Sequence, residues 1–228
     1  MSHAAVKERV SSLKGTFVPL LVALMVVLVI APVAEDWPVV ASVLVTVLLV
    51  TGVLAVHEHS LLRRGMVVAV VITLVLRWLA HVHGEEHRSL VIVSHLALGI
   101  YMLLLTGISV AAVLRRERVT GDTILGAVCG YILIAYVFTF GYAVIEDLNP
   151  GNFSSSLVLP EYDGAKIGHG TPELLYYSFV TLTTVGYGDI VPATPVARII
   201  TICEVFIGYI MLGGLLSIFT NKMAKRGD

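Results

Sequence analysis

The spacing of its apolar runs constrains this chain of 228 residues more than any other feature. Six runs are almost free of charged residues, and they cover approximately residues 17–34, 38–56, 66–80, 90–114, 123–145 and 195–220. All except the third are near the roughly 20 residues that a helix needs to cross the hydrocarbon core of a bilayer. Hydrophobic residues make up 57% of the chain, charged residues 14%, and the mean hydropathy is +0.91. We therefore predict an all-α membrane protein with six transmembrane helices.

The first run has an alternative interpretation as a secretory signal peptide, because Pro32-Val33-Ala34 places a small residue at a plausible cleavage position. We interpret it as a retained first span.

Basic residues are distributed unevenly between the two sides of these spans. Eleven lie on the side that holds both termini: Lys7, Arg9, Lys14, Arg63, Arg64, Arg115, Arg116, Arg118, Lys222, Lys225 and Arg226. The opposite loops hold Arg88 and Lys166, with Arg77 and Arg198 near the outer ends of spans. Because Lys and Arg are enriched in cytoplasmic loops, we predict a multi-pass protein of the cell membrane with both termini in the cytoplasm. The segment between the fifth and sixth spans would then enter the membrane from outside.

That segment contains a short predicted helix at residues 172–183, with Thr171 as N-cap, Pro172 at the first helical position and Glu173 in the first turn. At roughly 12 residues it is too short to cross a bilayer, so we predict a re-entrant helix. Its C-terminal dipole end would favour a cation nearby.

The next six residues are Thr184-Val185-Gly186-Tyr187-Gly188-Asp189. A row of carbonyl oxygens that face one axis can surround a dehydrated cation, but an ordinary strand turns successive carbonyls to opposite sides. Alternate residues therefore need positive φ, which Gly186 and Gly188 adopt without steric cost. Thr184 can add its hydroxyl oxygen, while Val185 and Tyr187 would point away from the axis. One chain supplies one wall of such a cage, so four copies are predicted to surround one pore.

TVGYG is the filter sequence of potassium channels in general, and from about Gly121 to its end the chain resembles the pore domain of the tetrameric potassium channel family. The resemblance implies a pore domain at 121–228, with outer helix 123–145, turret 146–171, pore helix 172–183, filter 184–189 and inner helix 195–220. It implies a homotetramer in which Thr184, Val185, Gly186 and Tyr187 coordinate K⁺. It also implies filter support from Gly188, Asp189, Tyr176 and Tyr177, the two tyrosines forming part of an aromatic cuff around Tyr187.

Two further positions bear on gating. Some family members have a buried carboxylate where this chain has Val180, so a carboxylate-pair mechanism of filter inactivation is not expected here. Gly208 lies where the family often has a hinge glycine. Since glycine costs about 1 kcal/mol relative to alanine in a helix, Gly208 indicates either bending or close packing, and both interpretations stay open. Close packing is favoured for Gly213-Gly214.

Residues 1–120 are predicted to form a four-helix membrane domain that resembles a voltage sensor in helix number only. A sensor needs several charges that move through the field, yet the fourth run has no arginine between Leu90 and Leu114, and Arg77 is the only basic residue of the third. We expect gating that is not strongly voltage-dependent. The connector from Arg115 to Asp122 spans only about 12 Å as a helix and about 29 Å when fully extended. This favours a non-swapped tetramer, in which each four-helix domain docks on its own pore helices.

Histidines form a second candidate site. His81, His83 and His87 share a predicted external loop with Glu85 and Glu86, and a smaller predicted internal cluster holds His57 and His59. Such clusters can sense pH or bind Zn²⁺; the alternative is a solvated loop at the membrane interface. His95, alone in the fourth run, is interpreted as a hydrogen-bonded core residue.

The sequence argues against other classes of function. It shows no nucleophile–base set and no nucleotide-binding loop, so we predict no enzyme and no cofactor, with K⁺ only as the permeant ion. The net charge of −1 gives no reason to expect a nucleic-acid partner, and Cys129 and Cys203, both in apolar runs, imply no disulfide framework. The predicted partners are three further copies of the chain and the lipid bilayer. Two alternatives stay open: a regulatory or poorly conducting channel subunit, and a carrier-type K⁺ transporter, although carriers generally contain four quasi-repeats.

Overall fold

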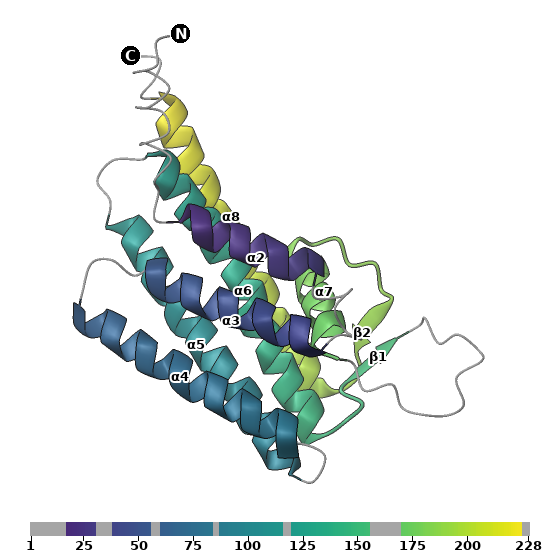
Figure 1. Ribbon diagram of the computed structural model, residues 1–228. Coiled ribbons are helices and arrows are strands. Elements are labelled where there is room, and N and C mark those ends of the chain that lie inside the picture. Colours follow the sequence, from purple (N-terminus) through teal and green to yellow (C-terminus); the bar gives the residue numbers. More distant parts are fainter. Residues whose placement is uncertain are drawn as a thin grey trace.

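The computed structural model describes residues 17–30, 38–55, 60–83, 87–115, 120–155 and 170–224. These residues form seven helices and two short strands, and the predicted helical class is confirmed (Figure 1). In chain order the elements are α2 (Val18–Ile30), α3 (Pro38–Ala55), α4 (Ser60–His83), α5 (Arg88–Leu114), α6 (Gly121–Leu148), β1 (Phe153–Ser155), α7 (Thr171–Leu182), β2 (Ile190–Pro192) and α8 (Pro195–Ala224).

Three helices in the described part of the chain are long and apolar enough to cross a membrane, namely α5, α6 and the segment Pro195–Gly214 of α8. Val18–Ile30 and Ser42–Ala55 are apolar but shorter. Helix α4 is longer than the predicted run at 66–80, because it also includes Arg63 and Arg64 at its start. The chain is therefore a membrane protein by composition and helix length, and the six-span arrangement stays a prediction.

Helix α6 begins at a capping box that was not predicted from the sequence. The Thr120 hydroxyl accepts a hydrogen bond from the backbone N–H of Thr123, and Oγ1 of Thr123 accepts one from the N–H of Thr120. These bonds satisfy backbone donors that would otherwise be unpaired, and such a cap stabilises a helix by about 1 kcal/mol. As a result α6 covers residues 121–148, where the sequence predicted 123–145.

Helices α2 and α5 pack directly on α6 of the same chain, while α3 packs on α2 and α4 packs on α5. The N–H of Phe17 donates to Oδ1 of Asp122 at 3.3 Å, and the Tyr136 hydroxyl donates to the carbonyl of Leu24 at 3.0 Å, so α2 and α6 run in the same direction. Tyr101 of α5 donates to the carbonyl of Leu49 in α3 at 2.6 Å. These bonds join the N-terminal helices to one another and to α6 within one chain, and the non-swapped tetramer stays a prediction.

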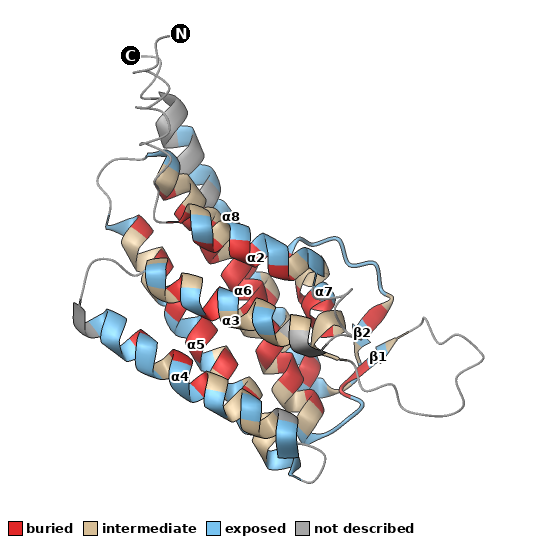
Figure 2. Cartoon of the chain, in the orientation of Figure 1, coloured by how far each residue is buried: buried red, intermediate tan, exposed pale blue. Residues whose placement is uncertain are grey.

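Buried residues gather where α2, α5 and α6 meet, as the colouring of Figure 2 shows. Several leucines there have no exposed surface: Leu20, Leu24, Leu98, Leu105 and Leu133. In contrast, α4 leaves an apolar face exposed, which includes Val71, Val75 and Trp78. Lipid chains are a suitable neighbour for such a face, because it presents few polar groups.

The segment predicted as a polar turret, 146–171, contains ordered elements that the sequence did not predict. Its first residues belong to α6, and β1 pairs antiparallel with β2, with Phe153 opposite Pro192. Asn152 precedes β1 and is buried, and its Nδ2 donates to the carbonyls of Ile145 and Asn149. The strand pair therefore joins the end of α6 to the residues that follow the TVGYGD stretch.

Candidate functional site

The TVGYGD stretch leaves directly from the C-terminal end of α7. The N–H of Thr184 donates to the carbonyl of Thr181 at 3.0 Å, and the carbonyl of Val180 accepts from Val185 at 3.0 Å and Gly186 at 3.3 Å. These bonds hold the first three residues of the stretch beside the negative end of the α7 dipole.

The start of α7 corrects one prediction. Thr171 is the first helical residue and not the N-cap; Gly170 takes the N-cap position and makes no side-chain hydrogen bond. Pro172 lies in the first turn, where its missing N–H costs nothing because that donor would have no intrahelical partner. The helix ends at Leu182, one residue before the predicted end.

Alternate residues of the stretch have left-handed backbone conformations. The φ angle is 57° at Gly186 and 78° at Gly188, as the sequence predicted, and it is 61° at Thr184, which the sequence did not predict. Positive φ is uncommon for a β-branched residue. Alternation of this kind turns successive carbonyls toward the same side, which an ordinary strand cannot do.

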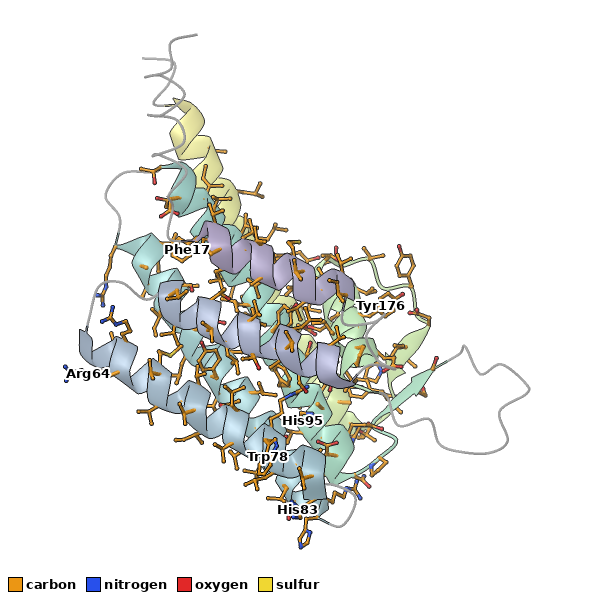
Figure 3. The ribbon with its side chains drawn as sticks, viewed as in Figure 1. Phe17, Arg64, Trp78, His83, His95 and Tyr176 are labelled. Atoms are coloured by element: carbon orange, nitrogen blue, oxygen red, sulfur yellow. The ribbon has the colours of Figure 1, made fainter. Side chains whose placement is uncertain are left out.

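Asp189 closes the stretch by bonding back to α7. The Tyr176 hydroxyl donates to Oδ2 of Asp189 at 2.6 Å, and the N–H of Ile190 donates to Oδ1 at 3.0 Å. The hydrogen bond from Tyr176 holds the pKa of the Asp189 carboxyl below its ordinary value. Tyr176, labelled in Figure 3, and Asp189 therefore form a link between α7 and the far end of TVGYGD.

Tyr177 faces away from Tyr187 of its own chain, and its predicted part in the aromatic cuff stays a prediction. It is buried on another face of α7, where its ring lies 5.4 Å from that of Tyr142 and 5.1 Å from that of Phe153. Its hydroxyl makes a 2.8 Å hydrogen bond with Oγ1 of Thr201 in α8. The reason is helical geometry, since neighbouring positions on a helix point about 100° apart. Within the described chain, Tyr177 packs α7 against α6 and α8, and makes no ring contact with Tyr187.

One side of the stretch is uncovered in a single chain. Val185 is 51% exposed and Tyr187 72% exposed, although both are large hydrophobic residues. The adjacent face of α8 is also apolar and exposed, at Ile199, Phe206 and Ile210. The described residues of one chain leave both of these surfaces uncovered.

Glu204 is a site residue that was not predicted from the sequence. It lies in α8, has no exposed surface, and its Oε2 accepts a 2.6 Å hydrogen bond from the hydroxyl of Tyr142 in α6. Its Oε1 is within hydrogen-bond distance of Oγ of Ser178 in α7. The signal was present in the sequence: Glu204 is the one acidic residue in the apolar run at 195–220, and ionisable residues in such runs are commonly functional.

Gly208 lies one helical turn after Glu204, and α8 continues through it without a break. A Cβ atom at Gly208 would lie 2.7 Å from Cδ1 of Leu182, so a close approach of α7 and α8 explains the glycine. The carbonyl of Leu182 also accepts a hydrogen bond from Tyr131 of α6 at 2.9 Å. A Cβ atom at Gly213 or Gly214 would meet no atom within 4 Å, so the described chain supplies no packing partner for these two glycines.

The histidine cluster gains no support as a metal site. His83 and His87 are exposed, and Figure 3 shows His83 pointing away from the protein at the end of α4. The His81 side chain and residues 84–86 lie outside the described part of the chain, as do His57 and His59. Within the described part, no group of three potential metal ligands comes together.

His95 lies inside the domain (Figure 3), as predicted. Its Nδ1 lies 2.6 Å from Oδ2 of Asp147, so it links α5 to α6. The same side chain lines a cavity of about 370 Å³ between the N-terminal helices and α7, together with Arg77 and Pro172.

Comparison with known proteins agrees with this geometry. Residues 132–225 match the family model described as ion channel. Similar proteins include the two pore potassium channel c of Oryza sativa subsp. japonica (38% identical), the two-pore potassium channel 1 of Arabidopsis thaliana (40%) and a voltage-gated potassium channel of Aeropyrum pernix (42%). The alignments cover 38%, 36% and 23% of this chain, and 19%, 22% and 18% of the three relatives. The chain thus spans about a fifth of the length of these curated relatives. No solved structure matches it.

The TVGYGD stretch follows the short helix α7, which lies in the chain between the long apolar helices α6 and α8. Residues 132–225 are thus similar to ion channels, and the named relatives of this part of the chain are potassium channels. Its relatives are channels and not enzymes, in agreement with the prediction that the chain is not an enzyme.

Proposed function

We propose that this chain forms a potassium-selective channel, in which four copies surround one pore and K⁺ moves passively down its electrochemical gradient. The observation that carries the proposal is the alternation of positive φ at Thr184, Gly186 and Gly188, directly after the C-terminal end of α7. Its occurrence within TVGYGD, in a chain whose named relatives are potassium channels, favours K⁺ over other cations.

In this proposal the protein replaces the hydration shell of the ion. The carbonyl oxygens of Thr184, Val185, Gly186 and Tyr187, with the Thr184 hydroxyl, take the place of water around each K⁺. Gly188, which directly follows this row, adopts the last left-handed conformation of the stretch. The link between Tyr176 and Asp189 holds the outer end of the row against α7.

The proposed membrane arrangement has six spans, the cell membrane as location and both termini in the cytoplasm. Eleven basic residues on one predicted side support it. The parallel course of α2 and α6 agrees with it, because the first and fifth of six consecutive spans must cross in the same direction.

The proposed homotetramer is supported by the apolar surface left uncovered around the stretch. Val185 and Tyr187 would be covered by neighbouring copies, and the exposed face of α8 by neighbours and lipid. Since α2 and α5 pack on α6 of their own chain, we propose that the four-helix domains are not swapped between subunits.

Purified protein in liposomes tests the proposal through paired K⁺ and Na⁺ flux measurements. We expect K⁺ flux to exceed Na⁺ flux greatly, and Gly186→Ala or Gly188→Ala to abolish this preference, because left-handed backbone costs an L-residue about 1–2 kcal/mol. The matched control is Gly107→Ala in α5, where an added Cβ would meet no atom within 4 Å. Equal fluxes of both ions, or unchanged selectivity in both filter variants, would refute the proposal. A folded wild-type protein that passes neither ion would favour the alternative function, that of a regulatory or poorly conducting channel subunit.

A further inference from the structure

Glu204 is placed where three helices of the pore domain meet. Its carboxyl group is fully buried between Tyr142 of α6 and Ser178 of α7. Among the described residues, no Lys or Arg forms an ion pair with Glu204. A buried ionised carboxylate without a cation is strongly unfavourable.

Each hydrogen bond around the Glu204 carboxyl group needs one proton, so the available hydroxyl protons can be assigned to their acceptors. A serine hydroxyl has one proton to donate, yet Oγ of Ser178 has two acceptor neighbours, Oε1 of Glu204 and the carbonyl of Ala135 at 2.9 Å. The Tyr142 hydroxyl provides the proton for Oε2 of Glu204, because its other neighbour, Oγ1 of Thr201, lies at 3.5 Å. If Glu204 were ionised, Ser178 could donate to only one of these two oxygens. The Ala135 carbonyl, which also accepts from the Thr139 hydroxyl at 2.8 Å, would then lie beside Oγ of Ser178 without a proton between them, and the buried charge would have no cation.

A proton on Oε1 of Glu204 satisfies every contact. Glu204 then donates to Ser178, Ser178 donates to the carbonyl of Ala135, and Tyr142 donates to Oε2. The nearby hydroxyls of Thr201 and Tyr177 have partners of their own. Thr201 donates to the carbonyl of Ala197 at 2.9 Å, and Tyr177 can donate to Thr201. The result is a continuous run of hydrogen bonds from α8 through α7 to α6.

We propose that Glu204 is held as a neutral carboxylic acid, and that its proton ties the inner helix α8 to the pore helix α7. Glu204 is thereby a positioning residue for the filter, which it does not touch. The protonation stands on the contacts alone, whereas the effect on ion flow rests on the proposed channel function.

The position of this tie connects it to the filter. Glu204 meets Ser178, and four residues later Gly208 meets Leu182, so one face of α8 follows one face of α7 down to its last residue. The TVGYGD stretch begins two residues after Leu182. A movement of α8 at Glu204 therefore changes the support of α7 at the point where the filter begins.

Removal of the proton would break this run of hydrogen bonds, because the Ser178 hydroxyl could then donate to Glu204 or to Ala135 but not to both, and it would leave a buried negative charge between α7 and α8. The described titratable groups that face Glu204 are all tyrosines, namely Tyr131 and Tyr142 of α6 and Tyr177 of α7. None of them supplies a positive charge. Alkaline conditions should therefore disturb the packing of α7 on α8.

Infrared spectroscopy of the full chain in lipid at neutral pH tests the protonation directly. We expect the wild type to show a protonated-carboxyl carbonyl band that is lost in Glu204→Gln, whose amide can replace both the donor and the acceptor. The control Asp122→Asn, at the start of α6, should leave the band unchanged. Should Glu204→Gln fail to fold, Tyr142→Phe should keep the band but move it to higher frequency, because one hydrogen bond to the carbonyl is removed. A wild type without the band, or a band insensitive to both substitutions, would overturn the proposal.

Flux measurements test the second part of the proposal, the effect of Glu204 on ion flow. We expect wild-type K⁺ flux to fall when the pH is raised, Glu204→Gln to keep its flux and lose this pH dependence, and Ser178→Ala to reduce flux about tenfold through the lost buried hydrogen bond. If Glu204→Gln is as damaging as Glu204→Ala, or keeps the alkaline response, the positioning role is wrong. The two proposals fail separately: the band without any K⁺ flux contradicts only the channel function, and selective flux without the band contradicts only the neutral acid.

Discussion

Thr184 shows how firmly the start of the filter is held. A β-branched residue with a φ of 61° is rare, and such a conformation costs on the order of 1–3 kcal/mol. The hydrogen bonds from Thr184 and Val185 to carbonyls of α7 offset this cost. The backbone at this point is therefore set by its attachment to α7 and not by the local preference of threonine.

At the outer end of the filter, Tyr176→Phe tests the link to Asp189. The substitution removes the donor to Oδ2, so the pKa of the Asp189 carboxyl should rise toward its ordinary value. A lowered pKa in the folded state stabilises that state above the ordinary pKa, and this contribution is lost as the pH falls through the lowered value. We expect K⁺ flux of the variant to decline at a higher external pH than that of the wild type during acidification.

The control for this experiment is Tyr101→Phe, whose hydroxyl bonds to Leu49 in the N-terminal domain. It should leave the acid dependence unchanged. Identical acid profiles for the wild type and Tyr176→Phe would show that the link does not support the filter.

Single residues differ in how far the sequence reveals them. Gly186 and Gly188 were predictable, because glycine is the residue that left-handed backbone favours. Thr184 was not, since threonine carries no such signal. Glu204 was visible as an acidic residue in an apolar run, but only the packing shows that it faces Ser178 and Tyr142. The partners of Tyr177 within its own chain, Tyr142 and Phe153, were not predicted, because adjacent tyrosines on a helix point in different directions.

Between elements, the contact of α7 with α8 at Gly208 distinguishes packing from bending. Gly208→Ala places a Cβ within 2.7 Å of Cδ1 of Leu182, and overpacking of this kind costs roughly 1–3 kcal/mol. We expect a lower thermal unfolding temperature in detergent and reduced K⁺ flux, both largely restored by Leu182→Val in the same chain. Gly213→Ala, which meets no atom, is the control. If stability recovers in the double variant but flux does not, Gly208 serves as a hinge.

The composition of α5 makes a prediction about voltage. Moving one elementary charge across 100 mV is worth about 2.3 kcal/mol, so several charges per subunit give a steep response. Helix α5 has no arginine between Leu90 and Leu114. We expect the open probability in planar bilayers to change only weakly with membrane potential. A steep curve that corresponds to several gating charges per subunit would contradict this expectation.

The helices were largely predictable as elements, because long apolar runs permit few other structures. Their ends were less so: α6 starts at a capping box, and α4 extends to include Arg63 and Arg64. The pairing of β1 with β2 could not be predicted, since each strand has three residues and they lie far apart in the sequence. Short strands of this kind depend on tertiary packing rather than on local preference.

For the whole molecule, the packing of α5 on α6 offers a test of the proposed subunit arrangement. A Cβ at Gly126 would lie 2.8 Å from Cγ2 of Val113, so cysteines at these two positions are close enough for a disulfide. In a variant without Cys129 and Cys203, Val113→Cys with Gly126→Cys should form a bridge within one chain. Denaturing electrophoresis without reductant should then show only the monomer band, while native mass spectrometry of the same protein shows four copies.

Swapped subunits would give a different pattern. Bridges between α5 of one chain and α6 of the next would produce dimer to tetramer bands on the denaturing gel. The single variant Val113→Cys should give no bridge to Gly126 in either arrangement. A mass other than that of four copies would contradict the proposed tetramer.

The most direct test of potassium selectivity is the zero-current potential of the reconstituted channel with K⁺ on one side of a planar bilayer and Na⁺ at equal concentration on the other. We predict a large potential that makes the K⁺ side negative, because K⁺ leaves that side while Na⁺ does not permeate. We predict that Gly188→Ala abolishes this potential. A zero-current potential near zero in the wild type would contradict the proposed function, since it would mean that the row of carbonyls from Thr184 to Tyr187 does not select K⁺.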